Sequence, residues 1–214
     1  WPVSRQITTS DPLVWIDCEM TGLDLGKDAL IEVAVLVTDG ELNIKDEGLD
    51  LLISPPSEAL KQMSDFVREM HTTSGLLADL ESATLTIAEA EKQILAHIQQ
   101  YVPGPRKTPL AGNTIGTDRS FLARDMPTLE QWLHYRNVDV STIKELAKRW
   151  YPKTYYNAPN KNGNHRALAD IQESIEELRY YREAVFVAEA PSTDQAREIA
   201  THHQGVITGF GHQD

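Results

Sequence analysis

The sequence predicts an α/β domain in which a mixed five-stranded sheet is flanked by helices. Three strand-like segments come first along the chain, and two further strands then alternate with helical segments. That order of elements is typical of a mixed sheet covered by helices. The chain has 214 residues, of which 41% are hydrophobic and 24% charged, so it is large enough to bury one complete core.

The first three predicted strands differ in their pattern of apolar residues. Residues 13–18 form a short apolar run typical of a buried strand, and residues 30–38 form a second run with many β-branched side chains. The segment 42–53 is more polar, and the Asp39-Gly40 pair before it marks a turn. The other two strands are short and are expected at residues 109–113 and 137–140.

The predicted helices follow from apolar residues at helical spacing. The clearest early one is 86–101, where apolar side chains form one stripe before Pro103-Gly104-Pro105 ends the run. A long amphipathic helix at 166–186 is the last expected core element. Further helices are expected at 64–70, 74–82, 118–125 and 141–150, the last capped by Ser141, and a polar loop at 153–164.

The predicted globular domain spans residues 11–187. Residues 1–10 are expected to form an N-terminal arm. Residues 188–214 contain mostly small and polar side chains, so we expect a partly ordered C-terminal tail with a short helix at 193–201. We assign no functional residue to the arm or to the tail.

Composition also indicates where the protein works. No apolar run approaches the roughly 20 residues of a bilayer crossing, so no membrane partner is expected. Cys18 is the only cysteine, which excludes an intramolecular disulfide framework and a multi-cysteine zinc site and fits a reducing compartment. The expected location is cytoplasmic.

The net charge of −12 is unevenly distributed. Residues 1–105 carry 6 basic and 18 acidic side chains, whereas residues 106–214 carry 14 of each. Unspecific affinity for long duplexes needs many basic contacts to phosphate, so this composition disfavours a broad nucleic-acid groove. It favours a small anionic ligand gripped locally, with bound cations cancelling clustered carboxylates and with phosphate contacts from the second half.

Two carboxylates stand at the end of the first predicted strand. Asp17 and Glu19 are two residues apart, so both side chains point to one face while Cys18 points to the other, into the core. Two acids on one face repel each other, and a hard cation such as Mg²⁺ or Mn²⁺ between them would remove that repulsion. This spacing alone is also common at solvated strand ends.

Two later segments add to this pair. Asp118 lies early in a helix that follows a strand and a glycine-containing turn. His165 lies in a loop before the last long helix, and Asp170 follows in the first turn and a half of that helix. Four acids and one histidine suit two-metal phosphodiester hydrolysis, in which two cations clamp the attacking and leaving oxygens and a histidine takes a proton from water.

In this order, Asp17, Glu19, Asp118, His165 and Asp170 resemble the catalytic set of the DEDDh exonucleases, which have a ribonuclease-H-like fold. The His-x4-Asp spacing defines the "h" subgroup. From about residue 13 to 187 the chain is more narrowly similar to the oligoribonucleases. The blocks that carry this similarity are Trp15–Leu23, Pro109–Asn113, His134–Arg136, Asp139–Leu146, Arg149–Pro152 and His165–Leu168.

The resemblance implies a homodimeric 3′–5′ exoribonuclease that cleaves dinucleotides and other very short RNA oligomers to mononucleotides. It implies two divalent cations, Mg²⁺ or Mn²⁺, as cofactors. The metal ligands that it implies are Asp17, Glu19, Asp118 and Asp170, with His165 as the fifth catalytic residue.

The same resemblance implies a substrate site that measures length. Leu23 would wedge between two bases, and Tyr135 would reach into the partner's site and close it. A base has an aromatic face that such groups can cover without reading sequence. Arg136, Ser141 and Thr142 would hold a 5′-phosphate, for which an arginine fork is well shaped.

Two positions depart from the family pattern, and one residue has two interpretations. Phe66 stands where many members have a tryptophan that packs on a base, so stacking is retained. Thr114 replaces a serine of the phosphate site and keeps the hydroxyl. His71 is either a substrate contact or a structural residue. The sequence does not decide between these roles.

Two other functions were weighed against a short-RNA nuclease. One is a general DEDDh 3′–5′ exonuclease that acts on longer DNA or RNA, and the His134–Arg136 and Asp139–Thr142 blocks argue against it. The other is a catalytically silent nucleotide-binding module with the same fold. The presence of all five catalytic residue types argues against that module.

Overall fold

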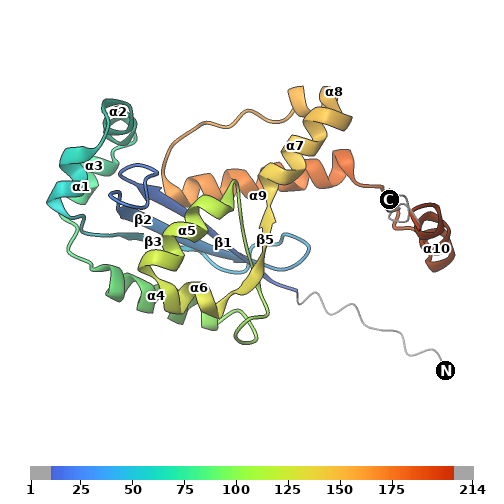
Figure 1. Ribbon diagram of the computed structural model, residues 1–214, viewed down its shortest axis with the longest axis horizontal. Helices are drawn as coiled ribbons and strands as arrows, with labels where there is room; N and C mark the ends of the chain where they lie inside the picture. The colour runs from blue at the N-terminus through green and yellow to red at the C-terminus, as the bar shows by residue number, and fades with distance from the viewer. Residues whose placement is uncertain (1–10, 205–214) are drawn as a thin grey trace, which may run out of the picture.

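The structure is a computed structural model that describes residues 11–204, and it contains one five-stranded sheet flanked by helices (Figure 1). The strand order is β3-β2-β1-β4-β5; the first three strands are antiparallel, and β4 and β5 run parallel to β1. The predicted fold class is therefore confirmed. The strands are β1 (Leu13–Met20), β2 (Leu30–Thr38), β3 (Leu49–Leu52), β4 (Pro109–Gly112) and β5 (His134–Asp139).

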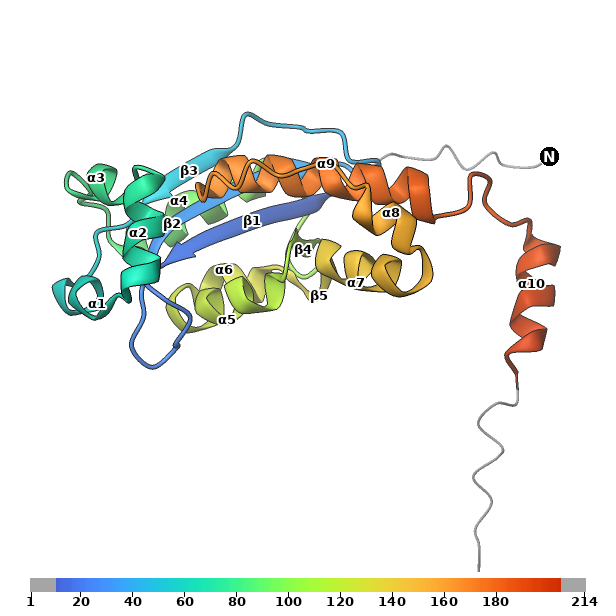
Figure 2. The same ribbon diagram turned by 90° about the horizontal axis from the view of Figure 1, so that it is seen from above.

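Helices cover both faces of the sheet. On one face, α5 packs on β1 and α4 packs on β2 and β3, around a core that includes Val14, Ile16 and Cys18 of β1; on the other, α9 packs on β1 and β2 and α7 packs on β4 and α9, around Trp15. Figure 2 shows α9 lying along β1 and β2. The helices are α1 (Ser57–Gln62), α2 (Asp65–Thr73), α3 (Leu76–Leu80), α4 (Ile87–Gln99), α5 (Ile115–Asp125), α6 (Pro127–Trp132), α7 (Val140–Trp150), α8 (Pro152–Tyr156), α9 (Ala167–Val185) and α10 (Thr193–His202).

The polar third strand is shorter than predicted. Only Leu49–Leu52 of the segment 42–53 forms a strand, and the chain before it is joined to the sheet by one isolated bridge at Ile44. The reason is that side chains replace strand partners here: the Asp46 carboxylate accepts the Val37 N–H, at 2.9 Å. Carboxylates of this kind compete with ladder hydrogen bonds for backbone donors.

Three short helices were not predicted, namely α1, α6 and α8, and α8 occupies part of the segment predicted as a loop. Each has five or six residues, too few for a periodic pattern, and α6 and α8 begin with a proline, which suits a first helical position. The predicted cap of α7 is also wrong. Asp139, not Ser141, caps this helix by accepting the Ser141 N–H.

The C-terminal segment contains the helix that the sequence predicted there. Ser192 caps α10 in a reciprocal pair with Gln195, and every residue of α10 is exposed. The arm predicted for residues 1–10 and the end of the tail, residues 205–214, lie outside the described residues. Among residues 11–204, no helix combines the length and apolar character that a bilayer crossing requires.

Candidate active site

The strand β1 carries the first two acids to the α9 side of the sheet. Because side chains alternate along a strand, Asp17 and Glu19 face α9 while Cys18 lies in the opposite core, as predicted. Asp170 extends from the first turn of α9 toward them. Carboxylate oxygens of Asp17, Glu19 and Asp170 all lie within 4.8 Å of one another.

The fourth predicted acid reaches β1 from its open edge. The β1–β4 ladder ends early because β4 stops at Gly112, which leaves the Cys18 N–H without a strand partner. The Asp118 carboxylate of α5 accepts this N–H at 2.9 Å and is itself buried. Asp118 therefore lies beside the three grouped acids, near Asp17, and helps to complete the sheet edge.

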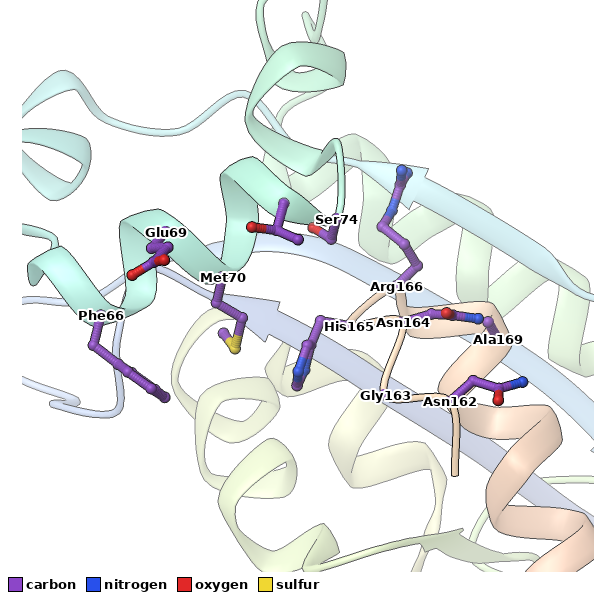
Figure 3. Close-up of a pocket in the computed structure, with 11 residues that line it drawn as sticks. Phe66, Glu69, Met70, Ser74, Asn162, Gly163, Asn164, His165, Arg166 and Ala169 are labelled. Carbon is purple, nitrogen blue, oxygen red and sulfur yellow. The ribbon is translucent and has the colours of Figure 1, made fainter. Parts of the chain in front are cut away.

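The predicted catalytic histidine lies on the loop before α9. His165 is exposed and has a left-handed backbone (φ 49°), a conformation that costs energy for a non-glycine residue. It borders a cavity of about 840 Å³ between α2 and this loop, and Figure 3 shows His165 extending in the same direction as Phe66 and Met70 of α2. The other lining residues are Glu69, Thr73, Ser74, Asn162, Gly163, Asn164, Arg166 and Ala169.

A buried glutamate that the sequence analysis missed fixes the start of α9. Glu32 is opposite Glu19 in the β1–β2 ladder and is fully buried. Its carboxylate accepts the Ala167 N–H at 2.8 Å and hydrogen bonds from Arg166 at 3.1 and 3.2 Å; Arg166 also binds Asp79. The one signal in the sequence was a charged residue inside the apolar run 30–38.

His71 is completely buried between α2 and β1. Its Nε2 lies 2.7 Å from the Met20 carbonyl oxygen, so Nε2 carries the proton and donates it, and Nδ1 lies 4.0 Å from a Glu19 oxygen. Burial lowers the pKa of His71, which favours the neutral imidazole. These contacts favour the structural interpretation over direct contact with a substrate.

The structure joins two of the predicted phosphate-site residues in a hydrogen-bonded network. The Thr114 and Ser141 hydroxyls are 3.0 Å apart, and the Thr114 N–H donates to Ser141 and to Asp139. Ser141 also donates to Asn113, whose amide donates to Ser174 of α9. Thr114 has a left-handed backbone (φ 49°), which is unusual for a β-branched residue and is held here by these bonds.

The remaining predicted substrate residues are exposed on separate elements. Leu23, Phe66 and Tyr135 are 72%, 77% and 75% exposed, so a ligand can reach their apolar surfaces. Arg136 and Thr142 are also exposed. Tyr135 does not border the cavity that contains His165; it borders a separate hollow with Arg106, Arg119, Glu130, Gln131, Leu133 and His134.

The grouped acids have strongly altered proton affinity in the metal-free protein. Burial is the largest cause in each case: it raises the pKa of Asp17 well above its usual range, that of Glu19 to about 8, that of Asp118 to about 7 and that of Asp170 to about 6. Neighbouring carboxylates add to the effect, Asp118 on Asp17 and Asp170 on Glu19. An oxygen-only, mutually repelling donor set fits a hard divalent cation.

These shifts predict how pH and metal act on stability. Each carboxyl holds its proton more tightly in the folded than in the unfolded state, so the metal-free protein should lose stability as pH rises from about 4 to about 8. Mn²⁺ at 100 times its Kd should raise Tm by roughly 5–10 °C at about pH 8. The gain should be smaller near pH 5.5, because protons then compete for the ligands.

Thermal unfolding with EDTA and with Mn²⁺ at the two pH values measures both effects. Glu176→Gln is the matched control, because Glu176 is an exposed carboxylate on α9 outside the acid group, and it should show the same shifts. A Mn²⁺ shift that is absent, or equal at both pH values, would contradict the assignment.

A mixed five-stranded sheet that gathers carboxylates from β1, α5 and α9 fits the nuclease class that the resemblance implied. A family model described as "Exonuclease" matches residues 14–178. Oligoribonucleases of Cutibacterium acnes and Streptomyces coelicolor are 64% and 65% identical to this chain, covering 93% and 91% of it and 98% and 97% of themselves. The chain therefore belongs to the oligoribonucleases, within the exonuclease family.

Solved structures show the same fold at much lower identity. E. coli exonuclease I in a zinc-bound complex with single-stranded DNA has a TM-score of 0.63 and 15% identity over 91% of this chain. Exonuclease I of Methylocaldum szegediense has a TM-score of 0.57 and 24% identity over 81% of this chain. This chain spans 43% and 41% of those two longer chains, so the likeness concerns the fold.

Proposed function

We propose that the chain is a 3′–5′ exoribonuclease that hydrolyses dinucleotides and other very short RNA oligomers by a two-metal mechanism. The observation that carries this proposal is the group formed by Asp17, Glu19 and Asp170, with Asp118 beside it and His165 on the adjoining loop. Its relatives of more than 60% identity carry the name oligoribonuclease.

Asp17, Glu19, Asp118 and Asp170 would hold two divalent cations, Mg²⁺ or Mn²⁺. Bound there, such ions supply charge stabilisation for the attacking and leaving oxygens of a phosphodiester. His165, exposed beside the cavity, takes the proton from the attacking water. The Glu32 contacts to Arg166 and Ala167 hold the backbone next to His165, and we propose that they orient this base toward the acids.

Selection of short RNA requires contacts at both ends of a dinucleotide. Leu23 and Phe66 offer exposed apolar surfaces to its bases. Arg136 and Thr142, with the linked Thr114 and Ser141 hydroxyls, offer donors to a 5′-phosphate. A longer strand would have to continue past this phosphate site, and we propose that this limits the substrate length.

A length series tests the proposal. Wild-type protein with Mg²⁺ is incubated with 5′-labelled RNAs of two and about twenty residues and with a DNA of the longer length. The dinucleotide should disappear fastest, because only it satisfies the base and phosphate contacts together. Equal or faster loss of the long RNA would contradict the short-substrate proposal, and faster loss of the DNA would favour a general exonuclease.

We also propose a homodimer in which Tyr135 completes the partner's site. Tyr135 is exposed on β5, an edge strand, and lies apart from the cavity of its own chain. It stacks on His134, and the Arg136 guanidinium lies over its ring at 5.6 Å. These contacts orient an aromatic group outward, ready to cover a base bound elsewhere.

Mixing two inactive variants tests this arrangement. Asp17→Asn is expected to lower dinucleotide turnover at least about a thousandfold, and Tyr135→Ala at least about tenfold. In a mixed dimer, the Tyr135→Ala subunit keeps its acids and receives the intact tyrosine of its partner. An equal mixture after subunit exchange should recover about a quarter of wild-type activity, because half of the dimers then contain one good site. Activity no higher than the mean of the two variants would contradict the shared site.

We propose that catalysis needs only the residues from 11 to 187. All five catalytic candidates belong to β1, α5, α9 and the loop before α9. The helix α10 buries none of its residues and supplies none of these groups. The C-terminal tail would then serve another purpose than turnover.

The cytoplasm is the location that we propose for this enzyme. Its single cysteine, Cys18, is buried in the core and forms no disulfide. A nuclease for short RNA also needs access to the products of RNA decay. Both points favour a reducing intracellular compartment.

A further inference from the structure

The loop that joins β1 to β2 exposes two leucines and yet is closely braced. Leu23 is 72% exposed and Leu25 is 44% exposed, and Leu23 comes only four residues after Glu19. In Figures 1 and 2 this loop lies beside α2, at the end of the sheet that carries the acids. The loop therefore holds an apolar side chain in solvent, where a bound molecule can cover it.

Asp28 braces the loop from inside. Its carboxylate is buried and accepts the Thr21 hydroxyl at 3.0 Å and the Asp24 N–H at 2.9 Å. The Thr21 hydroxyl in turn accepts the Ala29 N–H at 3.0 Å. A Cβ on Gly22 would lie 2.4 Å from an Asp28 oxygen, so the glycine is what lets this carboxylate sit against the loop backbone.

Arg124 braces the same loop from outside. Its guanidinium, at the end of α5, donates to the carbonyl oxygens of Leu25 at 2.5 Å and Asp28 at 2.7 Å. Asp125 accepts two further bonds from this guanidinium and so fixes its orientation. Because α5 also carries Asp118, one helix is attached both to the acid group and to the loop that presents Leu23.

We infer that Asp28 and Arg124 are positioning residues that set the preference for a substrate with two bases by holding Leu23 at a fixed place relative to the catalytic acids. This inference rests on the proposed function, in which Leu23 contacts the bases. A preorganised loop does not have to be ordered when the substrate binds, so the full contact energy of Leu23 goes to binding. If the loop were mobile, the cost of ordering it on substrate binding would offset part of that contact energy.

Two substrates distinguish the contact between Leu23 and the bases from hydrolysis of the phosphodiester itself. One is a 5′-phosphorylated RNA dinucleotide, and the other is thymidine 5′-(p-nitrophenyl phosphate), which has a cleavable phosphodiester but no second base. The variants are Arg124→Lys, which cannot form the fork, and Gly22→Ala, which displaces Asp28 without changing charge. The control is Arg149→Lys, because Arg149 forms an exposed pair with Glu145 on α7.

The readout is kcat/KM for the dinucleotide divided by kcat/KM for the nitrophenyl ester. Both loop variants should lower this ratio about tenfold, which corresponds to about 1.4 kcal/mol, and the control should leave it unchanged. In a Leu23→Ala background, Arg124→Lys should change the ratio less than twofold, since both act through the same side chain and are therefore not additive.

Each other outcome has a defined meaning. An unchanged ratio in both loop variants would overturn the inference and leave the proposed function standing. If Arg124→Lys also lowered the ratio about tenfold in the Leu23→Ala background, the inference would be overturned too, because Arg124 would then act without Leu23. If wild-type protein hydrolyses the nitrophenyl ester but does not prefer the dinucleotide over longer RNA, the proposed function fails, and the inference fails with it.

Discussion

Replacing Asp17 by asparagine is expected to lower RNA hydrolysis by at least about a thousandfold, because it removes a charged oxygen ligand worth several kcal/mol of transition-state stabilisation. The shape of the side chain is conserved and the fold should persist. Burial and neighbouring acids raise the pKa of Asp17 in the metal-free protein, so a neutral amide there removes a repulsion. The metal-free variant should therefore unfold at a higher temperature than wild type at about pH 8.

Two measurements check this prediction. Single-turnover hydrolysis of the dinucleotide gives the loss of rate, and thermal unfolding in EDTA gives the change in stability. Glu176→Gln makes the same chemical change at an exposed position of α9 and should alter neither quantity. Retained hydrolysis in Asp17→Asn, or a lower metal-free Tm, would contradict the assignment of Asp17 to a cation site.

Replacing His165 by alanine is expected to slow hydrolysis by about 10²–10⁴-fold, which is the usual contribution of a positioned general base. The side chain is exposed and borders the cavity, so its removal creates no buried void. Cation binding should survive because the four acids remain. The Mn²⁺-dependent rise in Tm is thus the property that distinguishes loss of a base from loss of the metal site.

The control for His165 is His202→Ala, an exposed histidine on α10 that has no assigned role. It should retain wild-type rates. Added imidazole should restore part of the activity of His165→Ala, since a free base can then occupy the emptied position. Loss of the Mn²⁺ shift in His165→Ala would show that the residue supports the cations and would contradict a role limited to proton transfer.

Local sequence patterns were sufficient to predict much of this site. Strand alternation predicted that Asp17 and Glu19 share a face and that Cys18 turns into the core, and the structure confirms both. Helical spacing predicted α4 and α9 closely. These features depend on neighbours two to four residues away, so the sequence alone contains the information that they need.

Other features depend on contacts between distant segments. Asp118 is held by the Cys18 N–H, which is free only because β4 stops early, and no local pattern reports where a neighbouring strand ends. Ser141 is a plausible cap by sequence, yet Asp139 takes that role and Ser141 instead bonds to Asn113 and Thr114. The choice between two capping residues was made by tertiary partners.

The sequence by itself determined the fold class, the order of the strands along the chain and the residue types of a cation site. The tertiary structure decided which of these groups meet: it brings Asp170 within 4.8 Å of Asp17 and Glu19, anchors the loop of His165 through Glu32, and braces Leu23 through Arg124. The physical reason is the separation along the chain of the residues that interact. Periodicity encodes which face a side chain occupies, whereas contacts between residues that lie 99 to 153 positions apart in the chain are set only when the helices pack on the sheet.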